Sequence, residues 1–145
     1  ASGLGVDLSE AACLQASANA VLHRVEDRIE ILQSDWFEKV EGAFDLIVSN
    51  PPYIALSEME HLSPEVRGHE PDMALTDGGD GLAAYRVIAA EVRNHLLAGG
   101  RLLLEIGPTQ GQAVSDLLAA AGLEQIRVLP DLDGRDRVVF AQNPL

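Results

Sequence analysis

The sequence predicts an α/β fold: a Rossmann-like, largely parallel sheet with helices on both faces and an antiparallel strand at its C-terminal end. Patterns typical of strands and helices alternate along the chain, and helices between strands imply crossover connections between parallel neighbours. The last two strand patterns are separated only by residues 130–136, which contain no helical pattern, so we expect these strands to be antiparallel. A length of 145 residues suits one compact domain, which we assign to residues 1–145.

Three strands and one helix are predicted in the first third of the chain. The apolar run at residues 4–6 is typical of the end of a strand. Ser9 is a suitable N-cap for a helix that extends to about Ala20. Residues 29–32 and 44–48 are rich in apolar and β-branched side chains. The second segment has the continuous apolar character of a buried strand, and we expect it to be one.

A long loop separates this region from the remaining elements. Residues 51–81 contain four prolines and little periodicity, and long loops in compact domains are usually functional. Residues 82–97 place apolar side chains along one face of a helix, which the pair Gly99-Gly100 is expected to end. Four further elements complete the predicted order: a strand over 101–106, a helix over 110–121 that ends at Gly122, and two strands over 125–129 and 137–141.

The charge and composition limit the kind of partner. Ten basic residues against 23 acidic ones give a net charge of −13, which repels the phosphate backbone of nucleic acid, so we expect no direct nucleic-acid partner. No apolar run reaches the length of a membrane span and no signal peptide is visible. We therefore expect no membrane partner and a cytoplasmic location. The single cysteine, Cys13, excludes an intrachain disulfide and fits a reducing compartment.

The most specific motif is Asn50-Pro51-Pro52-Tyr53, which directly follows the predicted strand at 44–48. Ligands of open α/β sheets bind at the carboxyl ends of strands, so the motif lies where chemistry is expected. The two prolines stiffen the segment and remove two N–H donors. The Asn50 side-chain oxygen and the backbone carbonyls remain as acceptors, and Tyr53 adds a flat aromatic surface. The structural alternative is a rigid proline turn with a capping asparagine.

These groups suit the chemistry of a planar amide or aromatic amine. Such a nitrogen is a poor nucleophile with a delocalised lone pair and two N–H donors. Two acceptors that bind both N–H groups would hold the nitrogen towards an electrophile and stabilise the positive charge that develops on it. A stacked ring would fix its plane. The motif therefore predicts Asn50, Pro51 and Tyr53 as catalytic residues, with Pro52 as a further substrate-binding residue.

Acidic side chains follow the other two predicted strands of this region. Asp7 comes directly after the first strand, where a carboxylate can accept bonds from both hydroxyls of a ribose. Asp35 and Trp36 follow the second strand; the carboxylate could accept from an adenine amine, and the indole could pack on the ring. Each feature alone has a simpler interpretation, a helix-flanking aspartate or a loop aspartate beside a core tryptophan. Together with Asn50 they predict a cofactor site.

Seven segments resemble the peptide-chain release factor glutamine methyltransferases, in order and over essentially the whole chain. They are Gly5–Ser9, Gln33–Phe37, Val48–Ile54, His69–Pro71, Gly78–Leu82, Leu103–Gly107 and Asp131–Val138. The asparagine–proline motif is shared with DNA adenine methyltransferases. The late Asp-Leu-x-Gly-Arg-Asp-Arg run is more particular to the release factor enzymes.

The resemblance implies a class I methyltransferase fold and a reaction. The methyl group of S-adenosyl-L-methionine (SAM) would pass to the glutamine amide in the Gly-Gly-Gln motif of peptide-chain release factors. By position, Asp7 would bind the ribose of the cofactor, and Asp35 with Trp36 would hold its adenine. Asn50 and the Pro51 carbonyl would bind the substrate amide.

Further residues of the long loop are expected around this site. The resemblance implies that Tyr53 packs on the substrate amide, and that Glu70 and Pro71 shape the loop over it. His61 and His69 could line the mouth of the loop. No histidine or cysteine cluster has the spacing of metal ligands, so we expect no metal. The reaction needs no strong base, because a methylated nitrogen loses its proton readily.

Two parts of the family are not matched by these residues. They are the glycine-rich loop after the first sheet strand, which contacts the methionine part of the cofactor, and the N-terminal helical domain, which helps to bind release factor. We therefore expect a partial catalytic domain that lacks the first strand, binds the cofactor weakly and is inactive alone. Since the unmatched strand is central in the family's sheet, the strands at 4–6 and 44–48 should each have an unpaired edge.

Three alternatives remain open at this point. Glutamine methylation of a ribosomal protein would need a nearly identical site. Adenine methylation of DNA would use the same asparagine–proline chemistry, although the charge of −13 opposes it. A non-catalytic fragment is the third possibility. The run Gly134–Val138 favours release factor over the other substrates.

Overall fold

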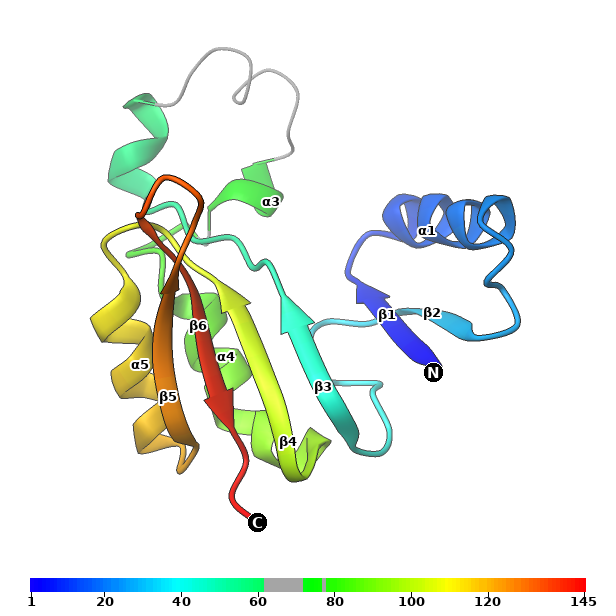
Figure 1. Cartoon of the computed structure of the whole chain (residues 1–145). Coiled ribbons are helices and arrows are strands. Elements are labelled where there is room, and N and C mark those ends of the chain that lie inside the picture. Colours follow the sequence, from blue (N-terminus) through cyan, green and yellow to red (C-terminus); the bar gives the residue numbers. More distant parts are fainter. Residues whose placement is uncertain (62–71, 77) are drawn as a thin grey trace. The chain divides into compact units, whose positions relative to one another are not determined.

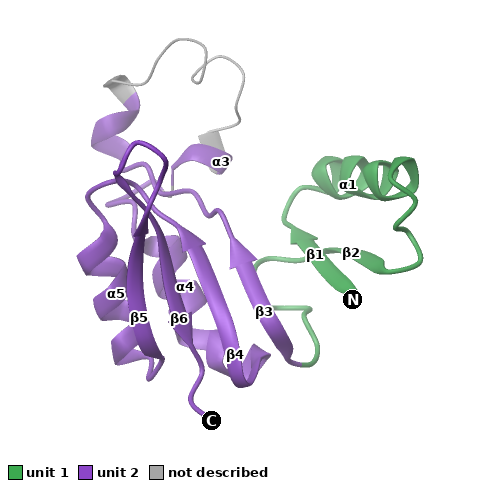
Figure 2. Cartoon of the chain, viewed as in Figure 1, with its two compact units in different colours: residues 1–42 green, residues 43–145 purple. Residues whose placement is uncertain are grey.

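The computed structural model describes residues 1–61, 72–76 and 78–145. These residues form two compact units, Ala1–Gly42 and Ala43–Leu145 (Figure 2), and each unit is described by itself. The α/β fold class predicted from the alternating pattern is confirmed: strands and helices alternate through most of the chain (Figure 1).

The first unit is a parallel strand pair with one helix packed on it. Strand β1 (Gly3–Asp7) pairs with β2 (Ile29–Gln33), and the register places Asp7 opposite Gln33. Helix α1 (Glu10–Leu22) connects them and buries Cys13 and Ala20. The predicted N-cap is confirmed, because the Ser9 hydroxyl accepts a bond of 3.3 Å from the backbone N–H of Ala12.

The second unit is a four-stranded mixed sheet. Its spatial order is β3 (Phe44–Ser49), β4 (Leu96–Glu105), β6 (Asp136–Gln142), β5 (Glu124–Pro130). Strands β3 and β4 are parallel, whereas β6 is antiparallel to both of its neighbours. The predicted antiparallel pairing of the last two strands is therefore confirmed, and β6 lies between β4 and β5.

One face of this sheet holds the core, covered by helices α4 (Ala83–Glu91) and α5 (Gly111–Ala120), which lie on the same side (Figure 1). Side chains alternate along β4 and β6, so every second one points at the helices. The fully buried residues include Leu102, Leu104, Val139 and Ala141 from the strands, Tyr85 and Ile88 from α4, and Val114 and Leu118 from α5. Burying each large apolar side chain contributes about 1.5–3 kcal/mol.

The opposite face of the sheet is open within this unit. The expected burial of the strand at 44–48 is wrong for two of its side chains, because Leu46 is 46% and Val48 66% exposed. Both lie on the face that α4 and α5 do not cover, and β3 pairs with β4 alone. Strand β1 likewise pairs only with β2, so the predicted unpaired edges are present among the described residues. Helices on both faces of one sheet remain a prediction.

The pair Gly99-Gly100 does not end a helix, contrary to expectation. Helix α4 ends at Glu91, a short 3₁₀ helix η2 (Val92–His95) follows, and β4 already begins at Leu96. Gly99 has a φ of 73°, which favours glycine, and Gly100 accepts a bond of 2.8 Å from the Asn143 N–H. A Cβ on Gly100 would lie 2.8 Å from the Leu97 carbonyl oxygen. The two glycines therefore lie in an irregular stretch within β4, where its register with β3 shifts.

The predicted long loop contains two short helical turns. These are the 3₁₀ helix η1 (Leu56–His61) and α3 (Asp72–Leu75). Ile54, just before η1, forms a parallel bridge with Thr76, just after α3, and the Ile54 N–H donates to the Leu75 carbonyl at 3.0 Å. The N–H of Leu56 donates to the Gly79 carbonyl at 2.9 Å. The segment after Tyr53 is thus paired with Leu75, Thr76 and Gly79.

Candidate functional site

The predicted site residues belong to two units, and each group has its own local geometry. Asp7, Asp35 and Trp36 lie in the first unit, whereas Asn50 to Tyr53 lie in the second. Both groups follow the carboxyl ends of parallel strands, which is where α/β sheets bind ligands.

In the first unit the structure brings the predicted cofactor residues to one edge. The Asp7 carbonyl accepts a bond of 3.0 Å from the Ser34 N–H, which joins the ends of β1 and β2. The exposed Asp7 carboxylate accepts a bond of 2.8 Å from the Ser9 N–H, and this contact fixes its orientation. Asp35 is exposed and Trp36 is half-buried. Asp7, Asp35 and Trp36 therefore all follow the carboxyl ends of the same pair of parallel strands.

Trp36 has an unusual backbone conformation. Its φ is 48°, in the left-handed region that costs a residue with a side chain about 1–3 kcal/mol. Ser34, which is buried, stabilises the turn: its hydroxyl donates to the Trp36 carbonyl at 3.1 Å and accepts from the Lys39 N–H at 3.1 Å. Sequence reasoning did not predict this role of Ser34, because its hydrogen bonds follow from the folded turn.

In the second unit the motif at 50–53 directly follows the end of β3. Asn50 is exposed, Pro51 is buried, and Pro52 and Tyr53 are half-buried. No hydrogen bond among the described residues involves the Asn50 side chain, so its amide oxygen can accept from a ligand. The prolines hold the segment rigid through fixed φ angles rather than through N–H bonds.

The ring of Tyr53 is held by the end of β4. Its hydroxyl donates to Glu105 Oε1 at 3.3 Å. Burial, followed by the negative charge of Glu105, raises the pKa of the Tyr53 phenol, so the phenol stays neutral at neutral pH. The hydroxyl of the buried Tyr85 donates to the Glu105 carbonyl at 2.7 Å. Tyr53 therefore offers a fixed ring and not a base.

Gln110 is the site residue that sequence reasoning missed. Its side-chain amide donates to the Tyr53 carbonyl at 2.9 Å and to the Gly81 carbonyl at 3.1 Å. Its Oε1 accepts from the Gly107 N–H at 2.9 Å. In the sequence only the start of a helix was assigned to Gln110. Its place between a predicted strand and a predicted helix, three residues after Gly107, was the signal available in the sequence.

A chain of charged groups joins the tyrosine to the turn between β5 and β6. Arg137 lies 3.9 Å from Glu105 Oε1 and 3.3 Å from Asp131 Oδ2. Asp131 Oδ1 accepts from the backbone N–H groups of Asp133 and Arg135 at 2.9 and 3.0 Å. The bond from the Arg135 N–H has the largest effect, and together the two bonds lower the pKa of the Asp131 carboxyl. The segment 131–137 thus contacts the same glutamate that holds Tyr53.

Several predicted features of the long loop are not described. His69, Glu70 and Pro71 lie outside the described residues, and so does the side chain of His61. No group of histidine, cysteine or acidic side chains in the described part of the chain could hold a metal ion. Within the same residues, no helix is both long and apolar enough to cross a membrane.

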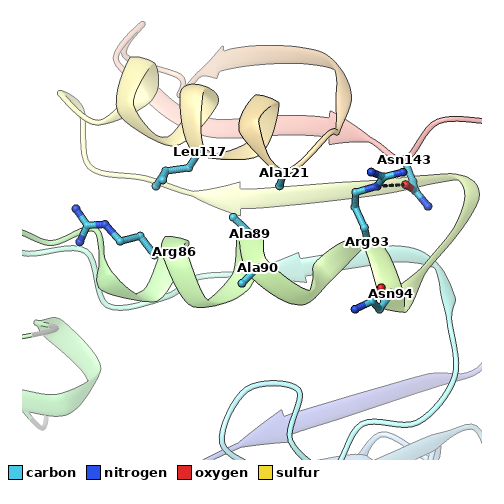
Figure 3. A pocket seen from close by; sticks show the side chains of 8 residues that line it. All are labelled: Arg86, Ala89, Ala90, Arg93, Asn94, Leu117, Ala121 and Asn143. Carbon is cyan, nitrogen blue, oxygen red and sulfur yellow. Dashed lines mark hydrogen bonds between the residues drawn. The ribbon is translucent and has the colours of Figure 1, made fainter.

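A separate pocket lies between α4 and α5, away from the predicted residues. It has a volume of about 530 Å³ and is lined by side chains of α4, of η2, of α5 with the following Ala121, and by Asn143 (Figure 3). The guanidinium of Arg93 donates to Asn143 Oδ1 at 3.3 Å across one end. None of the residues predicted to bind cofactor or substrate lines this pocket.

More than half of the chain matches one known protein family. A family model described as "Methyltransferase small domain" matches residues 3–80, which include every residue predicted for the cofactor and substrate sites. The chain belongs to this methyltransferase family.

Several relatives of this methyltransferase chain carry the same name. A release factor glutamine methyltransferase from Cereibacter sphaeroides is 57% identical over 144 residues, which cover 99% of this chain and 52% of the relative. The enzyme of the same name from Caulobacter vibrioides is 46% identical, and the match covers 100% of this chain and 51% of the relative. That from Agrobacterium fabrum is 45% identical, and the match covers 96% of this chain and 48% of the relative. The chain therefore spans about half the length of these relatives.

Solved structures show that the fold is that of methyltransferases. A methyltransferase from Pyrococcus furiosus superposes with a TM-score of 0.71 at 17% identity, over 98% of this chain and 62% of that one. A release factor-specific protein-(glutamine-N5) methyltransferase from Alicyclobacillus acidocaldarius gives a TM-score of 0.52 at 22% identity, over 99% of this chain and 80% of that one. The Rossmann-like methyltransferase fold predicted for the chain is thus confirmed.

Proposed function

We propose that the protein containing this chain transfers the methyl group of SAM to the side-chain amide nitrogen of the glutamine in the Gly-Gly-Gln motif of peptide-chain release factors. The observation that supports this most directly is the segment 50–53. It presents an exposed asparagine beside a buried proline and a tyrosine ring fixed by Glu105. The names of relatives at 45–57% identity give the same substrate.

The residues of the first unit fit the nucleoside part of SAM. Asp7 is oriented by the Ser9 N–H and offers a carboxylate to vicinal hydroxyls. Asp35 would accept from the adenine amine, and Trp36 would pack on the ring. One solved relative in fold, an RNA methyltransferase from Salinibacter ruber, is a complex with S-adenosyl-L-homocysteine. When bound, SAM supplies a methyl group on a positively charged sulfur.

The residues of the second unit would activate the substrate nitrogen. The Asn50 side-chain oxygen and the Pro51 carbonyl would accept hydrogen bonds from the two N–H groups of the substrate amide. Both bonds would strengthen as positive charge develops on the nitrogen. SAM would supply the methyl group to the nitrogen held by Asn50 and Pro51, and S-adenosyl-L-homocysteine would be the other product. The nitrogen then loses one proton to water. Tyr53 fixes the plane of the amide, and its raised pKa keeps the phenol protonated throughout.

The remaining partners follow from the same proposal. The net charge of −13 opposes nucleic acid as a direct partner, and we expect no membrane partner. A substrate from the translation machinery would place the reaction in the cytoplasm. We regard methylation of a ribosomal protein glutamine or of DNA adenine as competing outcomes of the test below.

The test measures methyl transfer by the complete gene product that contains this sequence. Purified protein is incubated with SAM labelled with tritium in its methyl group and with release factor, ribosomal proteins or duplex DNA. Label should enter release factor, and should be lost when the glutamine of its Gly-Gly-Gln motif is replaced by alanine. Label in DNA or in a ribosomal protein, with none in release factor, would refute the proposal.

A further inference from the structure

The side-chain amide of Gln110 joins three backbone segments that are distant in sequence. Its Nε2 donates to the Tyr53 carbonyl at 2.9 Å, across 57 residues, and to the Gly81 carbonyl at 3.1 Å, across 29 residues. Its Oε1 accepts from the Gly107 N–H at 2.9 Å. Both N–H groups and the carbonyl oxygen of the amide are therefore used within the protein.

We infer that Gln110 is a positioning residue that sets the place of the segment 50–53 for methyl transfer. This inference rests on the proposed function, since it assigns the segment to the substrate. Gln110 does not touch the substrate in this role. It acts through the carbonyl of Tyr53.

Two glycines make the close approach possible. Gly81 has a φ of 77°, and a Cβ there would lie 2.4 Å from the Tyr53 carbonyl oxygen and 2.9 Å from Gln110 Nε2. A Cβ on Gly107 would lie 3.2 Å from Gln110 Oε1. The backbone segments can converge on Gln110 because neither glycine places a side chain between them.

The segment 50–53 depends on contacts of this kind. Pro51 and Pro52 have no N–H groups, so they cannot anchor the segment by donating hydrogen bonds. Tyr53 is anchored at both ends: its carbonyl accepts from Gln110, and its hydroxyl donates to Glu105. Because the proline φ angles are fixed, a shift of the Tyr53 carbonyl moves the Pro51 carbonyl and Asn50 with it. A misplacement of about 1 Å can cost roughly a hundredfold in rate.

Gln110→Glu is the sharpest perturbation, because it conserves shape. The introduced carboxylate can still accept from the Gly107 N–H, but its second oxygen faces the carbonyls of Tyr53 and Gly81 and repels them. Gln112→Glu is the matched control. Gln112 lies two residues further along the chain, is exposed, and donates only to Asp116 in the described structure, at 2.8 Å. Both changes add one negative charge near the N-terminus of α5.

The experiment is run on the complete gene product, with kcat calculated per folded molecule from circular dichroism. For Gln110→Glu we expect kcat for release factor to fall about a hundredfold, while the Kd for SAM stays within a few-fold of the unsubstituted value. Lowering the pH from 8 to 6 should restore part of the loss, because the two facing carbonyls disfavour the charged carboxylate and raise its pKa, and protonation returns one donor to the group. Gln110→Met, which has no donor, should lose a similar factor without that pH dependence. Gln112→Glu should keep its turnover.

Hydrogen exchange gives a second readout that needs no substrate. Amides of residues 53–56 should exchange faster in Gln110→Glu and Gln110→Met than in Gln112→Glu. Unchanged exchange in this segment, or turnover per folded molecule equal to that of the control, would overturn the inference. If the unsubstituted protein leaves release factor unlabelled, the proposed function fails instead, and the exchange data still decide whether Gln110 anchors the segment.

Discussion

Replacing Asn50 with alanine is expected to separate catalysis from folding. The side chain is exposed and makes no hydrogen bond to the described residues. Its removal should therefore change the free energy of unfolding by less than about 0.5 kcal/mol, as for other surface substitutions. In the reaction the same oxygen would bind a nitrogen that gains positive charge. Loss of one such preorganised contact costs about 3–4 kcal/mol, or roughly a hundred- to thousandfold in turnover.

The assay compares single-turnover methylation and thermal melting of the same samples. Asn50→Ala in the complete gene product should lose turnover while its affinity for SAM stays close to normal, since the contact forms mainly in the transition state. Asn94→Ala is the matched control, because Asn94 is also exposed and lies in η2, outside the predicted site. It should retain both turnover and melting temperature.

The opposite pattern would refute the reasoning. If Asn50 only caps a turn, alanine should lower the stability by about 1 kcal/mol and leave the methylation rate largely intact. A melting temperature that falls for Asn50→Ala while the rate per folded molecule holds would remove the catalytic role of this residue.

Three further predictions concern neighbouring groups. Tyr53→Phe removes the bond to Glu105 but keeps the ring, so it should lower stability by about 1 kcal/mol and change kcat only a few-fold; a loss as large as that of Tyr53→Ala would assign the hydroxyl to the reaction. Gly81→Ala should lower the stability by at least about 1–2 kcal/mol in urea unfolding, because of its positive φ and the 2.4 Å approach to the Tyr53 carbonyl; an unchanged midpoint would contradict this. Trp36→Ala should weaken SAM binding in calorimetry of the complete gene product, and Trp36→Phe should retain most of it; equal affinity in both would remove Trp36 from the cofactor site.

Local signals in the sequence were sufficient for elements whose determinants lie within a few residues. Ser9 caps α1 through the Ala12 N–H, three residues on. The helix predicted to close at Gly122 ends at Ala120, and Gly122 has the expected positive φ of 84°. The motif at 50–53 was found because its acceptors, its rigid prolines and its aromatic ring all belong to four consecutive residues.

Features set by distant partners could not be predicted in the same way. The Gly99-Gly100 pair resembles a helix stop, but its conformation is fixed by Asn143, more than forty residues later. The burial of β3 depends on which elements cover each face of the sheet, and its own residues do not specify this. Gln110 escaped notice for the same reason, because its bonds to Tyr53 and Gly81 form only when the chain has folded.

The convergence of Gly81, Gly107 and Gln110 has an evolutionary consequence. A side chain at Gly81 would lie 2.9 Å from Gln110 Nε2, and one at Gly107 would lie 3.2 Å from its Oε1. At Gly81 the nearest atom is the Tyr53 carbonyl oxygen itself, 2.4 Å from the Cβ position, so a side chain there would displace the acceptor as well as the amide that donates to it. A change at either glycine should therefore act on Tyr53 through residue 110, and we expect the three positions to evolve as a coupled set.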